Sequence, residues 1–475
     1  MAKLRLLCAL TLLAAAAAGQ LAAAPSQAPQ ALQPGVLVAK VISATQPEQS
    51  YALYLPSNYS PEKKWPVVYV FDPGARGSVP LELMKDAAER YGYILACSNN
   101  SRNGAWKMEM DAAQAVFKDT HDRLAIDNRR VYFAGLSGGA RVASQIAQLC
   151  KCAAGVLLNG AGFSNGTTPS SEAIFPVFAA VGNYDFNYGE LIALDARLEA
   201  LQFPHWLRRF EGPHEWAPAN VMLEAFAWFR LLAMKAGSEP RDNSFATAQS
   251  AEAMQRAQTL EQSGDLYAAW TEYLQASETF RNFADASPME ERSNALGKEK
   301  AVREGAKREK QEIEEQQRLQ GPISAGLGAL QGNDLDRSEA RHTIELLITE
   351  LRSNADHEKR PEKLRVEKRA LAGILVEAVE TGSQQLEAKE YSRAQDYFEL
   401  AVNADPGSVW ALGSLAVARA LSGNRKGALE ALRRAKDRTK DPTAFTTWLK
   451  SEAAFEKLKD SPAFQALLGQ QQSEH

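Results

Sequence analysis

The chain has 475 residues, of which 45% are hydrophobic and 24% are charged, and its formal net charge is −4 at pH 7. This length exceeds one typical domain, so we expect two or three domains, and the apolar fraction is sufficient for a sizeable core. The slightly acidic balance gives no reason to expect nucleic acid, which requires a basic face, so we predict no nucleic-acid partner.

Residues 1–24 have the pattern of a secretory signal peptide. Lys3 and Arg5 precede an apolar run over residues 6–19, and Ala-rich cleavage options follow it. We therefore expect a secreted or periplasmic protein with no stable membrane span after cleavage. The alternative is an uncleaved N-terminal membrane anchor, because the apolar run approaches spanning length.

Three cysteines remain outside this segment: Cys97, Cys150 and Cys152. An odd number argues against a disulfide scaffold, and Cys97 ends an apolar run that is typical of a buried strand. Cys150 and Cys152 are too sparse for a zinc site, so we predict no metal.

Between residues 35 and 237 the pattern alternates between strands and helices. Strand-length apolar runs occupy residues 36–43, 51–56, 66–72, 92–98, 129–135, 155–162, 175–182 and 205–212. Helix-length segments occupy 80–92, 110–125, 139–150 and 189–202, and a last helix covers 219–237. Short, nearly all-apolar strands separated by amphipathic helices predict a doubly wound, mostly parallel sheet covered on both faces. The first two strands have no helix between them, so we expect them to form an antiparallel edge.

Residues 238–250 are polar, contain Pro240, directly follow Gly237, and are predicted to be a linker. Residues 251–475 lack strand signals and are predicted to form an all-α domain. Within that domain, residues 289–322 are dense in Glu, Lys, Arg and Gln, which indicates a solvated long helix rather than a binding tail.

Residues 382–406 and 414–442 share one repeated layout. Each has a small residue at a helix–helix turn, then Ala, a hydrophobic residue and Ala at matching positions, and a Pro after them: Ala394, Phe398, Ala401 and Pro406 in one, Ala428, Leu432, Ala435 and Pro442 in the other. Small residues let two helices pack closely, and Pro ends the second helix. The pattern resembles the tetratricopeptide repeat, most clearly over residues 378–442, with a degenerate copy over 260–276. Such repeats often bind peptide segments, so a protein partner is one expectation and a purely structural cap is the other.

Residues 135–139 read Gly-Leu-Ser-Gly-Gly, which fits the G-x-S-x-G nucleophile elbow. A good buried strand precedes Ser137 and a good helix follows it, as this turn requires. The flanking glycines remove Cβ atoms that would clash, so the hydroxyl projects at the start of the next helix. There the backbone N–H of Gly138 is predicted to face the oxyanion formed on attack.

A serine nucleophile requires a histidine base and a carboxylate, and on this kind of sheet they follow the serine in the order acid, then histidine. His214 lies in a loop just past the last strand, which is where the base belongs. His205 lies at the other end of that strand and is the weaker alternative. Asp185 follows the preceding strand and is the predicted acid, because Asp195 lies within a helix.

Two further loops are predicted to lie at the same carboxyl edge of the sheet. Pro73 has no N–H, so Gly74 or Ala75 is the candidate for the second oxyanion donor, and Gly74 is preferred because it allows close backbone approach. The loop over residues 98–106 follows the fourth strand. Its side chains Asn100, Arg102, Asn103 and Trp106 are predicted to line an acyl or sugar pocket, unless they only stabilise their own turn.

Residues 131–142, with Ile126 and Asp127 upstream, resemble the α/β-hydrolase fold, and the similarity covers residues 35–237. The chain is similar to secreted esterases of the feruloyl-esterase and polyhydroxybutyrate-depolymerase kind. In these a D-x-x-R-V-Y segment leads into the elbow, and a stretch like Gly212–Trp216 carries the base. One departure is Asp72-Pro73, where those esterases usually have His-Gly, which puts the second oxyanion donor in question.

From these residues we expect an exported serine hydrolase that cleaves a carboxylic ester, on a small molecule or attached to a polymer, without a cofactor. The segments between Ser137, Asp185 and His214 are too short for a large lid, so the site is expected to be open or roofed by the helical half. A serine peptidase on the same fold is one alternative. A non-catalytic binding or scaffold protein that uses the repeats is the other.

Overall fold

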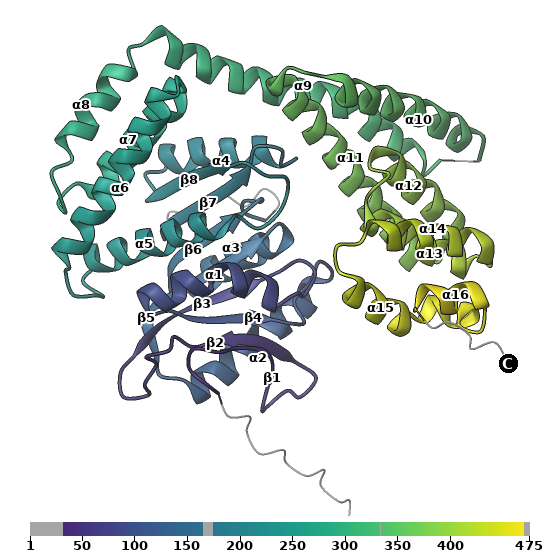
Figure 1. Cartoon of the computed structure of the whole chain (residues 1–475), viewed down its shortest axis with the longest axis horizontal. Helices are drawn as coiled ribbons and strands as arrows, with labels where there is room; N and C mark the ends of the chain where they lie inside the picture. The colour runs from purple at the N-terminus through teal and green to yellow at the C-terminus, as the bar shows by residue number, and fades with distance from the viewer. Residues whose placement is uncertain (1–31, 165–173, 333, 470–475) are drawn as a thin grey trace, which may run out of the picture. The chain divides into compact units, whose positions relative to one another are not determined.

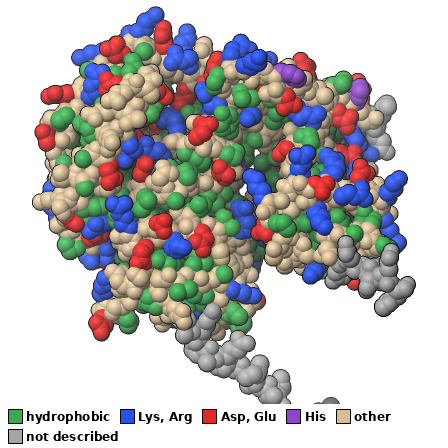
Figure 2. All heavy atoms as spheres, in the orientation of Figure 1, with side chains coloured by type: hydrophobic (Ala, Val, Ile, Leu, Met, Phe, Trp, Pro, Cys, Tyr) green, Lys and Arg blue, Asp and Glu red, His purple; other side chains and the backbone are tan. Residues whose placement is uncertain are grey.

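The computed structural model describes residues 32–164, 174–332 and 334–469, so the predicted signal peptide lies outside the described residues. Within these ranges, no helix combines the length and the apolar character needed to cross a membrane. On the face drawn in Figure 2, basic and acidic side chains are interspersed.

The first half of the chain builds one eight-stranded sheet with the order β1-β2-β4-β3-β5-β6-β7-β8 (Figure 1). β1 and β2 pair antiparallel, β2 joins β4 antiparallel, and every other pairing is parallel. The expected antiparallel edge is therefore confirmed. The strands are β1 Leu37–Ile42, β2 Ser50–Tyr54, β3 Trp65–Phe71, β4 Ile94–Ser98, β5 Ile126–Leu136, β6 Ala153–Asn159, β7 Val177–Gly182 and β8 His205–Phe210.

Both faces of the sheet are covered, as near-continuous apolar strands require. Side chains alternate along β7: Phe178 and Ala180 belong to the core beneath α5, whereas Ala179 and Val181 pack against α4. α1 and α5 pack against each other on the first of these faces. The helices of this half are α1 Ser78–Tyr91, α2 Trp106–Arg123, α3 Gly138–Cys150, α4 Tyr188–Ala200 and α5 Ala219–Lys235.

The second half is entirely helical over its described residues, which together with the mostly parallel sheet confirms the predicted fold class, a doubly wound α/β sheet followed by an all-α part. Its helices are α6 Asn243–Gln262, α7 Leu266–Phe280, α8 Ser287–Leu296, α9 Lys300–Ala329, α10 Asp334–His357, α11 Pro361–Glu387, α12 Tyr391–Ala404, α13 Val409–Leu421, α14 Arg425–Arg438, α15 Pro442–Ser451, the 3₁₀ helix η1 Ala453–Leu458 and α16 Pro462–Leu467.

The connection between the halves is shorter than the predicted linker over residues 238–250. α6 begins at Asn243, because the Asp242 carboxylate caps it by accepting from the Phe245 N–H at 3.0 Å. Residues of α6 to α9, among them Ala253, Tyr273 and Phe280, then join the same buried core as the sheet. A second core begins at Ile323 and runs to the C-terminal helices.

The helix pairs expected from the repeat are present as α11 with α12 and α13 with α14. A Cβ at Gly382, inside α11, would lie 2.7 Å from the Phe398 ring, so this glycine allows α11 and α12 to pack closely. The Ala, Phe and Leu positions of the pattern are fully buried. The relation to tetratricopeptide repeats stays a prediction.

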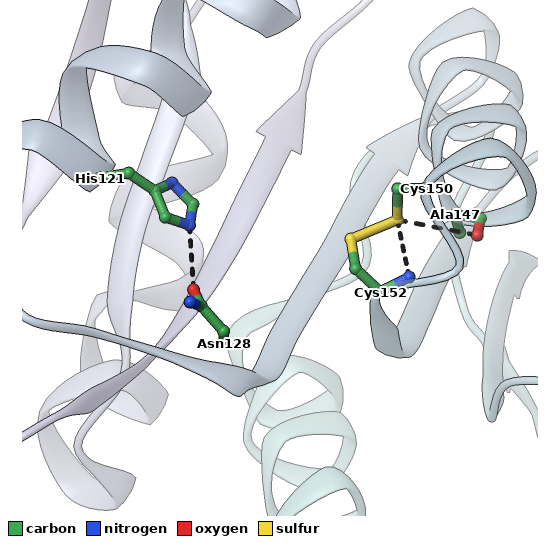
Figure 3. The surroundings of a disulfide bond; sticks show 5 residues. All are labelled: His121, Asn128, Ala147, Cys150 and Cys152. Atoms are coloured by element: carbon green, nitrogen blue, oxygen red, sulfur yellow. Dashed lines mark hydrogen bonds between the residues drawn. A yellow bond between two sulfur atoms is a disulfide. The ribbon is translucent and has the colours of Figure 1, made fainter.

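Cys150 and Cys152 form a disulfide where α3 turns into β6 (Figure 3). The bond spans Lys151, whose φ of 52° is unusual for a residue with a side chain. The third cysteine, Cys97, is free and buried, and burial raises the pKa of its thiol. Of the three cysteines outside the predicted signal peptide, two therefore form one local disulfide at a helix–strand turn, and the third is free.

Candidate active site

Ser137 occupies the tight turn between β5 and α3. Its backbone has φ 53° and ψ −122°, a conformation that a non-glycine residue adopts only where its surroundings enforce it. A Cβ at Gly135 would lie 2.0 Å from the Gly139 carbonyl oxygen, and one at Gly139 would lie 2.0 Å from that of Phe71. Both glycines of the motif are thus needed for the turn to form, and Ser137 lies at the N-terminus of α3.

Asp185 and His214 meet beside this turn, above the carboxyl ends of neighbouring parallel strands. The Asp185 Oδ1 and His214 Nδ1 atoms are 2.8 Å apart, and the Asp185 carboxylate is fully buried. The Asn187 N–H donates to the same Oδ1 at 2.8 Å. The Phe186 ring lies against the imidazole, with ring centres 4.3 Å apart. A buried carboxylate bound to one imidazole nitrogen holds the ring orientation and leaves the other nitrogen for proton transfer.

The described residues include no hydrogen bond between the Ser137 hydroxyl and His214, but one buried amide ties their loops together. The Ser137 N–H donates to the Asn159 carbonyl oxygen at 2.9 Å. The Asn159 side chain donates to the Glu215 carbonyl oxygen at 2.7 Å and accepts from the Ala217 N–H at 2.8 Å. Asn159 therefore fixes the histidine loop to the end of β6, next to the elbow. Sequence reasoning missed it, because an asparagine at a strand end gives no local sign of such distant partners.

Gly160 is a second residue that sequence reasoning missed. Its φ is +62°, and a Cβ there would lie 2.9 Å from Asp185 Oδ2 and 3.0 Å from His214 Cε1 and Nδ1. The only signal in the sequence is a glycine directly after an apolar strand. Any side chain at this position would press on the acid–histidine pair.

Asp72 connects the loop after β3 to the histidine loop. Its buried carboxylate accepts from Arg76 Nε and Nη2 at 2.9 Å each, and from Trp216 Nε1 at 2.9 Å. Burial by itself would raise the pKa of this carboxyl, but the hydrogen bonds from Arg76 and Trp216 outweigh it and hold the pKa below its usual value. Asp72 is therefore an ionised anchor beneath the site.

This anchor also engages the predicted second oxyanion donor. The Gly74 N–H donates to Asp72 Oδ1 at 2.8 Å, and the Ala75 N–H donates to the Asp72 carbonyl oxygen at 3.0 Å. Neither N–H points freely into the site in this structure, which is a correction to the expectation for Gly74. The reason is the aspartate that stands where the similar esterases usually have histidine.

The four predicted pocket side chains have three different surroundings. The Asn100 side chain accepts from the Ser50 N–H at 2.8 Å and donates to the Glu48 carbonyl oxygen at 3.3 Å, so it secures the loop before β2. Asn103 lies against the elbow, since a Cβ at Gly138 would meet its Oδ1 at 1.9 Å and its Nδ2 at 3.3 Å. Arg102 and Trp106 are exposed on the same loop.

The two rejected candidates for base and acid pair with each other. His205 Nε2 lies 3.4 Å from Asp195 Oδ1, and the His205 Nδ1 lies 2.8 Å from the Phe203 carbonyl oxygen. Burial lowers the pKa of His205, but the Asp195 hydrogen bond and the Phe203 carbonyl outweigh it and raise that pKa above the usual value. This pair lies at the amino end of β8, whereas Asp185 and His214 follow the carboxyl ends of β7 and β8.

No protein-family model and no curated protein matches the sequence. Among solved structures, the S-formylglutathione hydrolase of Staphylococcus aureus is 14% identical, with 38% of this chain and 90% of that chain covered and a TM-score of 0.32. A ferulic acid esterase is 17% identical, with 39% and 92% covered and a TM-score of 0.33. A fluorophosphonate-binding serine hydrolase of Staphylococcus aureus is 15% identical, with 41% and 98% covered and a TM-score of 0.35. The site is therefore assigned from its own residues.

Proposed function

We propose that this chain is an exported serine hydrolase that cleaves a carboxylic ester through an acyl-enzyme. The observation that carries the proposal is the buried Asp185 carboxylate 2.8 Å from His214 Nδ1, at the sheet edge where the elbow presents Ser137. Export rests on the N-terminal signal pattern alone.

In the proposed mechanism, Ser137 Oγ attacks the acyl carbon while His214 Nε2 accepts the hydroxyl proton. The charged imidazolium that results is stabilised by Asp185. His214 then returns the proton to the departing alcohol, and the same residues activate water to hydrolyse the acyl-serine. The Gly138 N–H and the N-terminus of α3 stabilise the negative charge on the tetrahedral oxygen.

Asn103 is the proposed substrate contact that the structure favours most, because its amide lies beside Gly138. Arg102 and Trp106 on the same loop would contact the acyl or sugar part of a small-molecule or polymer-linked ester. Asn100 is less suited to this role, because its amide is held by the Ser50 N–H and the Glu48 carbonyl oxygen. A protein partner bound through the helical repeats is a separate proposal.

A fluorophosphonate probe tests the catalytic assignment directly. We expect the probe to label the wild type and not Ser137→Ala, with unchanged thermal unfolding of the two proteins. Turnover of a short-chain nitrophenyl ester should fall by about 10⁴ or more in Ser137→Ala. Equal labelling of both proteins would place the reactive nucleophile elsewhere, and labelling of neither would favour the binding-protein alternative.

The choice of base is tested with His214→Ala and His205→Ala. Since His205 pairs with Asp195 away from the elbow, we expect His205→Ala to keep most of the turnover and His214→Ala to lose it. A greater loss in His205→Ala would reverse the assignment. Matched ester and amide substrates then separate an esterase from a peptidase.

A further inference from the structure

The loop that carries the acid is held from outside the sheet by two helices of the second half. This acid loop, residues 183–188, runs from the end of β7 to the first residue of α4. Helices α9 and α11 pack against each other, and both donate hydrogen bonds to its backbone. The described residues from Gln33 onwards form one compact unit.

Arg369 of α11 makes the first of these contacts. Its Nε donates to the Asn183 carbonyl oxygen at 2.7 Å, and its guanidinium lies 3.6 Å from the centre of the Tyr188 ring. The side chain is only 1% exposed, although Glu312, 3.5 Å away, is its only ion-pair partner among the described residues. Burying an arginine is costly unless its donors find partners. The buried guanidinium of Arg369 thus contacts both ends of the acid loop, at Asn183 and at Tyr188.

Gln316 of α9 makes the second contact. Its Nε2 donates to the Phe186 carbonyl oxygen at 2.8 Å, and the residue is buried. A Cβ at Gly373 of α11 would lie 3.5 Å from the Phe186 Cβ, so Phe186 is close to both helices. The Phe186 ring also lies against the His214 imidazole. Gln316 therefore binds the backbone of the residue whose side chain packs on the base.

A polar network and an apolar contact continue the same interface toward α4. The Glu309 carboxylate of α9 accepts from the Tyr188 hydroxyl at 2.6 Å and from Arg209 Nε at 3.1 Å. One turn further along α9, Ile313 fills the space above Gly189, where a Cβ would lie 2.8 Å from it. On α11, burial raises the pKa of the Glu380 carboxyl, and Arg141 and His214 act in the opposite direction. The two helices therefore pack against the acid loop and the start of α4.

We propose that Arg369 and Gln316 are positioning residues that hold the acid loop, so that α9 and α11 complete the active site rather than only capping the sheet or recruiting a partner. This inference rests on the proposed function. The contacts converge on residues 183–188, which include Asp185 and the Phe186 ring that packs on His214. Without them, the loop keeps its bonds to the sheet but loses those that hold the Asn183 and Phe186 carbonyl groups. Asp185 is then free to drift from His214.

The matched variants are Arg369→Ala, Arg369→Lys, Gln316→Ala and the control Arg365→Ala. Arg365 lies one turn before Arg369 on α11 and pairs with the same Glu312 at 2.9 Å, and none of its recorded hydrogen bonds goes to the acid loop. All variants are made in the full chain, and thermal unfolding establishes that each is folded. If Arg369→Ala does not fold, Gln316→Ala decides the question, since it removes an uncharged side chain.

Two readouts separate positioning from general stability. The first is kcat and KM on a short-chain nitrophenyl ester. The second is the proton NMR signal of the His214 Nδ1–H in ¹⁵N-histidine-labelled protein, identified by its loss in His214→Ala. We expect Arg369→Ala and Gln316→Ala to lower kcat about 10-fold or more with KM changed less than twofold, because small displacements of catalytic groups are costly. The same variants should broaden the proton signal, Arg369→Lys should restore part of both, and Arg365→Ala should match the wild type.

The proposal is overturned if Arg369→Ala and Gln316→Ala keep both kcat and the proton signal at the level of Arg365→Ala. It is also overturned if all three variants lose them equally, which would indicate a structural effect of the interface. If the wild type hydrolyses no ester while the proton signal responds as expected, the positioning role is supported and the proposed function is wrong.

Discussion

Replacing Gly160 with alanine tests the site at its most crowded point. Alanine at this φ of +62° costs about 1 kcal/mol of stability in backbone strain. The new Cβ would also lie 2.9 Å from Asp185 Oδ2 and 3.0 Å from the imidazole, whereas ordinary contacts begin at 3.4 Å, so the pair must move by about 0.4 to 0.5 Å. A displacement of about 1 Å can cost 10²-fold in rate, so we expect kcat to fall about 10-fold or more.

Gly237 provides a matched control. Its φ is +70°, and a Cβ there would meet nothing within 4 Å, so Gly237→Ala has a similar backbone cost without touching a neighbour. The assay is kcat and KM on a nitrophenyl ester together with urea unfolding of both variants. We expect both variants to lose a small amount of stability to backbone strain, and Gly160→Ala to lose somewhat more because its Cβ is crowded. We expect kcat to fall only in Gly160→Ala. Unchanged turnover in Gly160→Ala would refute the reasoning that Asp185 and His214 form the catalytic pair.

Two further predictions concern the loop beside the elbow and a buried carboxyl group. Asn103→Ala should lower kcat/KM for the ester about 10-fold, because the Asn103 amide lies beside Gly138. Asn100→Ala should leave kcat/KM within about twofold of the wild type, because its side chain is held by the loop before β2. Equal effects of the two variants would argue against a substrate contact by Asn103. Burial raises the pKa of the Glu109 carboxyl from 4.5 to about 7. The ionised carboxylate therefore destabilises the fold as the pH rises through this range. The loss is at most about 3 kcal/mol, at about 1.4 kcal/mol per pKa unit. Glu109→Gln should therefore be more stable than the wild type to urea at pH 8 and about equal at pH 4; a gain of the same size at both pH values would contradict this origin.

The elements that depend on neighbouring residues were predictable from the sequence. The elbow at Ser137 follows from glycines two positions to either side, and the structure shows the clashes that those glycines avoid. Alternation of apolar runs with amphipathic helices predicted the mostly parallel sheet, because a strand buried on both faces must be apolar throughout. The carboxyl ends of β7 and β8 then indicated Asp185 and His214, which the structure brings to 2.8 Å.

Side-chain partners from distant segments were decided only by the tertiary structure. Asp72 takes the Gly74 N–H that the local pattern assigned to the oxyanion, and Asn100 turns to the backbone of residues 48 and 50. Arg369 reaches a carbonyl group 186 residues away in the sequence. A local pattern specifies backbone conformation and the face that is buried, because both depend on residues a few positions apart. Which donor meets which acceptor depends on the loops that the fold brings together, and periodicity in the sequence does not contain that information.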